Sequence, residues 1–229
     1  MKNKDKEKRI IAVIGAGGKT SLILHIAKKL KEKGKKVIIT TTTHMYEPEK
    51  GYYREGQLKE IKKALEAGEP VWVGEPAREH KIKGVSDRFL EKLFLLDAAV
   101  LIEADGAKRL PCKVPAEHEP VIPKETQLVI GVAGLDCLGR PLKEICFRAG
   151  LAAELLGTDE NHLMTEADLK RLLSHSHGTK KGLLPHMEYQ VVLNKADLPG
   201  AEKAGERIKK ELEREGIGCT VLSCNKGGI

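Results

Sequence analysis

The sequence predicts an α/β protein, a three-layer α/β/α sandwich built on a mostly parallel sheet. Three observations support this prediction. Apolar runs of strand length alternate along the chain with amphipathic segments of helical spacing. Several of these runs are continuous blocks of Val, Ile and Leu without polar alternation, which is typical of parallel strands covered on both faces. The first run leads directly into a glycine-rich turn, in IIAVIGAGGKTS, and then into a helical segment.

The apolar runs predicted as strands are residues 10–14, 36–41, 71–73, 98–104, 127–132, 190–193 and 219–222. The amphipathic segments predicted as helices are residues 20–33, 57–67, 87–96, 147–156, 165–174 and 201–215. Ser86 or Asp87, and Thr165, are predicted N-caps, because short polar side chains accept hydrogen bonds from the first turn. Glycines at 34, 68, 157 and 216 are predicted to end helices.

The 229-residue chain is long enough for one α/β domain, which we expect over residues 10–229 after a charged, flexible arm at residues 1–9. No apolar run approaches the length of a membrane span, and the apolar run after the basic arm is too short for a signal sequence. The cysteines show no C-x-x-C spacing. We therefore expect reduced thiols, a cytoplasmic location and no membrane partner.

The formal net charge is +7, but the lysines are spread over predicted helix faces and aromatic residues make up only 3% of the chain. Solvated helix faces commonly carry such charges, and a chain poor in aromatic side chains has little with which to stack bases. We therefore expect no nucleic-acid partner and favour a small polyanionic ligand.

The glycine-rich turn has the features of a phosphate-binding loop, since glycines before a helix offer backbone N–H groups and a positive dipole end to an anion. A lysine there can reach the terminal phosphates, and a threonine hydroxyl can ligate Mg²⁺. The loop is shorter than a full Walker loop, and the alternative is a tight turn whose glycines only relieve strain. The residues predicted to bind the nucleotide phosphates are Gly15, Ala16, Gly17, Gly18, Lys19, Thr20 and Ser21.

Two other predicted strands end in groups suited to Mg²⁺. A run of threonines closes the second strand, and Thr42 is a predicted metal ligand; the alternative is a solvated strand end. The strand over residues 98–104 leads into Glu103 and Asp105. A carboxylate there would hold metal-bound water or orient the attacking water. Thr20 and Asp105 are further predicted metal ligands, and Lys19, Glu103 and Asp105 are predicted catalytic residues.

Residues 108–123 contain prolines at 111, 115, 120 and 123, so neither a helix nor a central strand is expected there. Lys108, Arg109 and Lys113 lie in this segment, close in sequence to the acidic strand end. These three cations could clamp an anionic substrate or the charge that develops in phosphoryl transfer, and of them we predict that Lys108 or Arg109 neutralises that charge. The alternative is a rigid surface connection with ordinary charges.

A base-recognition run follows the strand at residues 190–193. Asn194, Lys195 and Asp197 form the sequence NKAD, and a carboxylate at Asp197 can accept the two N–H donors of the guanine edge. Adenine lacks that donor pair, so the carboxylate would be left unpaired and adenine disfavoured. Residues 223–226, after the last strand, lie where GTPases close over the guanine. GTP is therefore favoured over ATP.

The motifs GAGGKTS, TTTH, IEADGAKRLPCKVPAEHEPVIP, the isolated Arg148 and VLNKAD occur in that order and resemble the YqeC family over residues 10–197. The resemblance implies a P-loop NTPase that serves maturation of selenium-dependent molybdenum hydroxylases, with such an enzyme or a cofactor precursor as partner. More distantly, Glu103-x-x-Gly106 with NKAD is similar to the nickel-delivery GTPases of hydrogenase and urease maturation. The short GxxGKT loop with TTTH is similar to ATP-using Mur-type ligases, but the chain lacks the length for their further domains.

Together these observations predict a Mg²⁺-dependent nucleoside-triphosphatase that couples hydrolysis to cofactor maturation. Two alternatives remain open. A small-molecule kinase or nucleotidyltransferase would act on a cofactor precursor, whereas a noncatalytic chaperone would hold nucleotide only to dock its client.

Overall fold

A computed structural model describes residues 10–224 of the chain. The arm predicted at residues 1–9 and two members of the last base-site run, Asn225 and Lys226, lie outside this range. The centre is a seven-stranded sheet of order β12-β11-β9-β1-β7-β2-β4, in which every neighbouring pair is parallel. Its strands are β1 (Ile10–Gly15), β2 (Val37–Thr41), β4 (Val71–Trp72), β7 (Ala99–Glu103), β9 (Leu128–Gly134), β11 (Glu188–Asn194) and β12 (Gly218–Val221).

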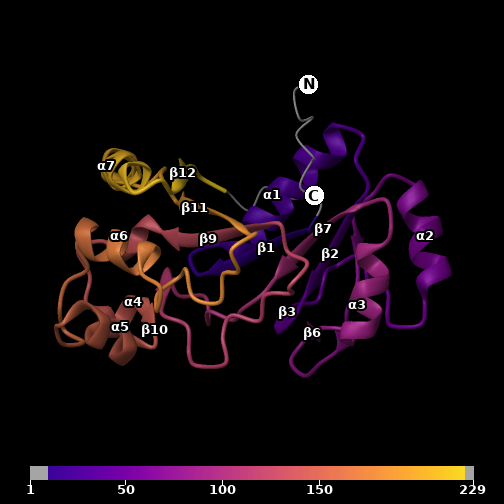
Figure 1. Cartoon of the computed structure of the whole chain (residues 1–229), viewed down its shortest axis with the longest axis horizontal. Coiled ribbons are helices and arrows are strands. Elements are labelled where there is room, and N and C mark those ends of the chain that lie inside the picture. The colour runs from indigo at the N-terminus through magenta and orange to yellow at the C-terminus, as the bar shows by residue number, and fades with distance from the viewer. Residues whose placement is uncertain (1–9, 225–229) are drawn as a thin grey trace.

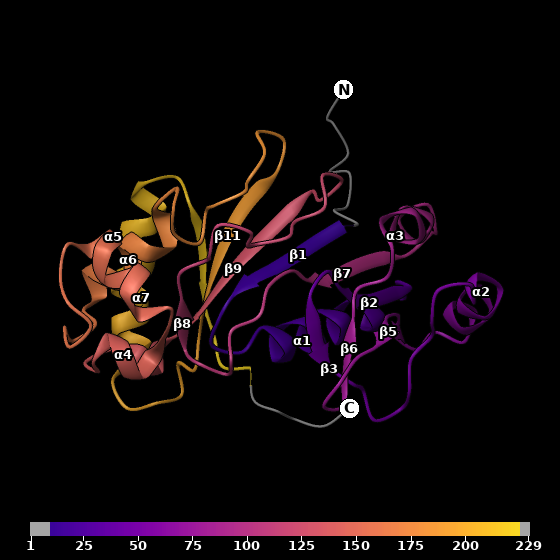
Figure 2. The same ribbon diagram turned by 90° about the horizontal axis from the view of Figure 1, so that it is seen from below.

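Helices connect these strands, as the alternating pattern predicts. They are α1 (Lys19–Glu32), α2 (Leu58–Glu66), α3 (Asp87–Phe94), α4 (Leu142–Ile145), α5 (Ala149–Leu156), α6 (Glu166–Ser174) and α7 (Ala201–Arg214), with the 3₁₀ turn η1 (Leu135–Cys137). In Figure 1 the sheet runs through the molecule with helices on either side, and in Figure 2 α4, α5 and α6 lie beside β9 while α2 and α3 lie at the opposite end. The predicted three-layer α/β/α arrangement is confirmed.

The layers follow from the alternation of side chains along β1. Val13 points to one face and packs with Leu22 of α1, whereas Ala12 points to the other and packs with Ile61 of α2 and Leu93 of α3. A third cluster joins β9 and β11 to α4, α5, α6 and α7. Because the central strands are covered on both faces, β2 and β9 are buried along their whole length.

The local helix signals predicted from sequence are present. The Ser86 hydroxyl accepts a hydrogen bond from the N–H of Phe89, and Thr165 forms a capping box with Asp168 at the start of α6. Gly157 ends α5 with a left-handed backbone, which glycine adopts without steric cost.

Two small sheets were not predicted. The first has the order β3-β6-β5, formed by β3 (His44–Tyr46), β5 (Glu75–Pro76) and β6 (Lys81–Lys83). The second pairs β8 (Cys112–Lys113), inside the proline segment, with β10 (Cys146–Phe147). These strands are two or three residues long and pair across distant parts of the chain, so sequence periodicity carries little information about them.

The position of β1 decides where the candidate functional residues meet. It lies between β7 and β9, with Val13 opposite Glu103 and Gly15 opposite Val132. Since all three strands are parallel, their carboxyl ends lie at one edge of the sheet, where ligands of open α/β sheets bind. No helix within residues 10–224 combines the length and apolar character needed to cross a membrane. The cysteines are free thiols, as their spacing predicts.

Two neighbouring leucines test the core between α3 and the sheet. Leu93 is fully buried, whereas Leu95 is 85% exposed. Leu93→Ala is expected to lower the free energy of unfolding by about 3 kcal/mol, because it removes buried methyl groups and leaves a cavity. Leu95→Ala is the matched control and should change it by less than about 0.5 kcal/mol. Urea denaturation of both variants measures the difference; equal losses would contradict this assignment of the core.

Candidate functional site

The turn between β1 and α1 passes very close to neighbouring residues, and only glycine fits at those points. Gly17 and Gly18 have φ angles of 78° and 120°, which L side chains rarely adopt. A Cβ at Gly17 would lie 2.1 Å from the backbone nitrogen of Gly134, and one at Gly18 would lie 2.3 Å from Nδ2 of Asn194. The glycines therefore let the turn pass close to the ends of β9 and β11.

The first three N–H groups of the turn bond to the protein itself. Gly15 donates to Oδ2 of Asp105 (3.0 Å), Ala16 to the carbonyl of Val132 (2.9 Å) and Gly17 to the carbonyl of Leu110 (3.0 Å). In this structure these three amides are therefore occupied by protein acceptors. The short loop is held against β9 and the proline segment, and its first amides are the attachment points.

The N–H groups of Gly18, Lys19, Thr20 and Ser21 are different. Within residues 10–224 no carbonyl or side chain accepts a hydrogen bond from them, and no side chain caps α1. A helix of 14 residues thus begins with open donors and the positive end of its dipole at the carboxyl edge of the sheet. This narrower set of amides is the part of the predicted loop that remains available to a phosphate.

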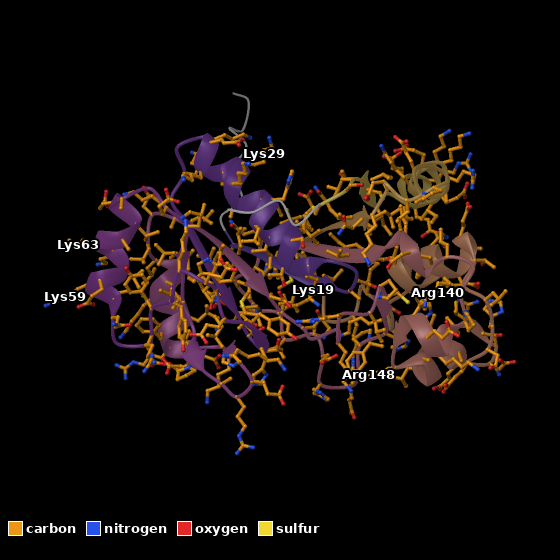
Figure 3. The ribbon with its side chains drawn as sticks, turned by 180° about the vertical axis from the view of Figure 1, so that it is seen from behind. Lys19, Lys29, Lys59, Lys63, Arg140 and Arg148 are labelled. Atoms are coloured by element: carbon orange, nitrogen blue, oxygen red, sulfur yellow. The ribbon has the colours of Figure 1, made fainter. Side chains whose placement is uncertain are left out.

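Lys19 lies inside this site, whereas most lysines are on the surface. Figure 3 shows Lys19 near the middle of the molecule, while Lys59 and Lys63 project outward from α2. Only 5% of Lys19 is exposed. Its Nζ donates to the carbonyl of Gly15 (2.8 Å) and lies 3.1 Å from Oδ1 of Asp105.

Both acidic groups predicted after β7 are brought to the loop. Asp105 is 2% exposed and Glu103 is 7% exposed. The Thr20 hydroxyl donates to Oε2 of Glu103 at 2.8 Å, and Nζ of Lys19 lies 3.9 Å from Oε1 of the same carboxylate. Burial raises the pKa of Glu103, although Lys19 and the Thr20 hydrogen bond oppose this shift.

The pair formed by Thr20 and Glu103 fits a magnesium ion. Neighbouring oxygen ligands of an octahedral Mg²⁺ lie about 3 Å apart, close to the observed separation of these two oxygens. No group of three or more His, Cys, Asp or Glu side chains in the described part of the chain is arranged to hold a metal. Mg²⁺ in nucleotide sites commonly takes only one or two protein ligands, with phosphate and water completing the shell.

The other predicted metal ligands are placed differently. Asp105 is engaged by Lys19 and by the N–H of Gly15. The Thr42 hydroxyl donates to the carbonyl of Val121 (2.7 Å). Thr41, in the same run of threonines, donates to the backbone carbonyl of Glu103 (2.7 Å) and so fixes the end of β7 against β2.

Of the three cations predicted to lie next to the acidic strand end, Lys113 is the one that reaches it. Lys108 and Arg109 are exposed, with Lys108 Nζ 5.1 Å from the ring centre of Phe147 and Arg109 Cζ 4.5 Å from that of Tyr46. Lys113 instead reaches the acidic cluster, with its Nζ 3.0 Å from Oδ2 of Asp105. Lys113 lies on β8 and is held inward, whereas the two preceding cations lie in a turn with positive φ.

Glu119 and Arg148 complete this cluster. Oε2 of Glu119 lies 2.8 Å from Lys113 Nζ and 2.7 Å from an Arg148 guanidinium nitrogen. Burial opposes ionisation of Glu119, but the hydrogen bonds from Arg148 and Lys113 lower its pKa to about 2. Glu119 is not among the site residues predicted from the sequence, where its only signal is its place among acidic and basic residues between prolines.

The NKAD run is attached to the glycine turn. Nδ2 of Asn194 donates to the carbonyl of Gly17 (2.9 Å), and its Oδ1 accepts from the N–H of Cys224 (2.8 Å). The Asp197 N–H donates to the hydroxyl of Ser223 (2.8 Å), while the Asp197 side chain is exposed. The ends of β11 and β12 therefore meet beside the turn.

Lys195 has a partner that the sequence did not indicate. Its Nζ lies 2.5 Å from Oδ2 of Asp136, which follows β9 in η1. The other oxygen of Asp136 is buried and has no hydrogen-bond partner within residues 10–224. Lys195 itself adopts a positive φ of 67°, a conformation that is uncommon for lysine.

The fold and site define an α/β protein with a glycine-rich strand-to-helix turn at the carboxyl edge of a parallel sheet. The profile of the family described as YqeC protein matches residues 11–150. A protein of Escherichia coli (strain K12) named "Uncharacterized protein YqeC" is 32% identical over 185 residues, which cover 78% of this chain and 72% of that protein. The chain belongs to the YqeC family.

The lowered pKa of Glu119 makes a prediction about stability in acid. A carboxylate with a folded-state pKa of about 2 and an ordinary value of 4.5 stabilises the fold fully above the ordinary value. That contribution is lost as the pH falls toward 2. Glu119→Gln should therefore make the loss of unfolding free energy in this interval shallower, by up to about 1.4 kcal/mol per pH unit.

The measurement is urea denaturation of wild type and variant at several pH values. Glu69→Gln, which removes an exposed carboxylate paired with Lys31, is the control and should change the slope much less. Parallel pH profiles for wild type and Glu119→Gln would contradict the assignment.

Proposed function

We propose that this protein binds a Mg²⁺-nucleoside triphosphate at the N-terminus of α1 and hydrolyses it. The observation that carries the proposal is the convergence of Lys19, the Thr20–Glu103 pair and the open amides of the first helical turn. Each of these groups suits one part of a metal-bound polyphosphate. Strain relief alone would account for the glycines, but not for a buried lysine and two buried carboxylates at the same helix end.

In this proposal each group of residues has a separate role. The amides of residues 18–21 bind phosphate oxygens, and Lys19 neutralises charge that develops on the terminal phosphate. Thr20 and Glu103 hold Mg²⁺, which when bound screens the phosphate charges. Burial of Glu103 makes its carboxylate less stable without a cation, so a dication beside it is favoured. Asp105 positions Lys19 and the Gly15 amide.

The base proposed for the nucleotide is guanine. The support is the attachment of Asn194 to Gly17 and of Asp197 to Ser223, which holds the NKAD run next to the phosphate site. The exposed Asp197 carboxylate is free of the buried cluster and can accept the paired donors of guanine.

We further propose that turnover serves the maturation of selenium-dependent molybdenum hydroxylases, with such an enzyme or a cofactor precursor as partner. This role rests on the YqeC family resemblance, whereas nucleotide binding rests on the site. The two parts can therefore be tested separately.

Lys19→Ala should abolish binding of a nonhydrolysable GTP analogue in the presence of Mg²⁺, because the buried cation facing the phosphate is removed. Isothermal titration calorimetry measures this, with at least a hundredfold loss of affinity expected as an order of magnitude. Lys28→Ala, which removes an exposed lysine of the same helix, is the control and should bind as wild type does. Unchanged affinity of the Lys19 variant would refute the phosphate site.

Asp197→Asn should weaken GTP binding about tenfold or more and leave ATP binding unchanged, because an amide cannot accept both guanine donors. Competition titrations with GTP and ATP on wild type and variant measure the base preference. Glu202→Gln, five residues further along the chain in the first turn of α7, serves as a charge-matched control. Equal effects of Asp197→Asn on both nucleotides would remove guanine from the proposal while leaving the phosphate site intact.

A further inference from the structure

Two buried lysines share one buried carboxylate. Oδ1 of Asp105 lies 3.1 Å from Lys19 Nζ, and Oδ2 lies 3.0 Å from Lys113 Nζ. The side chains of all three residues are at most 4% exposed. The N–H of Gly15 also donates to Oδ2. Two buried ammonium groups therefore lie beside the single negative charge of Asp105.

Lys19 is bound to protein groups in this structure, whereas its proposed role is to bind a phosphate. To bind a phosphate its Nζ has to leave Asp105 and the carbonyl of Gly15, to which it now donates. Breaking a buried ion pair is costly chiefly because the remaining charge is left uncompensated in a medium of low dielectric constant. If Lys19 were the only counterion of Asp105, each binding event would carry that cost.

Lys113 is held in its position by groups other than Asp105. Its Nζ donates to the carbonyl of Gly106 (2.7 Å) and to Oε2 of Glu119 (2.8 Å), in addition to its ion pair with Asp105. Glu119 is fixed in turn by Arg148. Apart from Asp105, Lys19 has a hydrogen bond to one carbonyl and a carboxylate 3.9 Å away, whereas Lys113 has hydrogen bonds to both a carbonyl and a carboxylate.

We propose that Lys113 is a positioning residue for nucleotide binding: it keeps Asp105 paired when Lys19 turns to the phosphate. The inference rests on the proposed function, since it needs a phosphate for Lys19 to bind. Lys113 itself does not touch the ligand. Glu119 holds Lys113 in place, and Arg148, which lies outside the proline segment, holds Glu119.

The test compares Lys113→Met with Lys113→Arg, alone and with Asp105→Asn, by calorimetric titration of the full chain with a nonhydrolysable GTP analogue and Mg²⁺. Lys113→Met should weaken binding about tenfold, or about 1.4 kcal/mol, because Lys19 is then retained by Asp105. Lys113→Arg keeps the charge and should bind within about threefold of wild type. Lys36→Met, which removes an exposed lysine paired with Glu66, is the matched control and should have no effect.

The combination with Asp105→Asn separates positioning from simple structural support. Removing the buried negative charge releases Lys19, so Lys113→Met should cost little affinity in the Asp105→Asn background. A purely structural lysine would instead lower the melting temperature and leave the dissociation constant unchanged, and that result would overturn the inference. So would an equal loss of affinity in both backgrounds.

A crystal structure of the wild-type protein bound to the same analogue is a further test. It uses no variant, so misfolding of a variant cannot affect it. Lys19 Nζ should then lie on phosphate oxygen while Lys113 Nζ remains within hydrogen-bonding distance of Asp105. A complex in which Lys113 leaves Asp105, or in which Lys19 stays there, would overturn the inference alone. Absence of any binding by wild type would overturn the proposed function, and the inference with it.

Discussion

The buried carboxylate of Asp105 is the interaction on which the site depends. It accepts the first N–H of the glycine turn and lies between Lys19 of α1 and Lys113 of the proline segment. A carboxylate with 2% exposure needs such compensation, because an unpaired charge in the protein interior is strongly unfavourable. One side chain thus joins the end of β7 to the loop, the first helix and a segment that has almost no regular structure.

The parallel sheet makes this meeting possible. β1 pairs with β7 on one side and with β9 on the other, so its glycine turn emerges between two strand ends. Val132 and Leu110 then accept the next two N–H groups of the turn, and Asn194 holds the carbonyl of Gly17. The loop is therefore supported from both sides, and its open amides are confined to the first turn of α1.

Much of this arrangement was visible in the sequence. Continuous apolar runs indicated parallel strands, Ser86 and Thr165 indicated helix starts, and glycine before Lys19 and Thr20 indicated the turn. Strand ends in a parallel sheet share an edge, so Glu103, Asp105 and Asn194 could be expected near one another. The short strands of the two small sheets could not be predicted, since two or three residues carry too little periodicity.

The sequence by itself determined the sheet, the helices that cover it and the side chains present at its carboxyl edge, because periodicity, caps and glycines act locally. Only the tertiary structure decided which cation reaches Asp105: Lys113, on a two-residue strand paired with β10, and not Lys108 or Arg109, which lie against aromatic rings. It also decided which amides stay open and that Lys195 meets Asp136. These outcomes depend on the path of the proline segment and on contacts between residues far apart in the chain. Such contacts cannot be predicted from local sequence patterns.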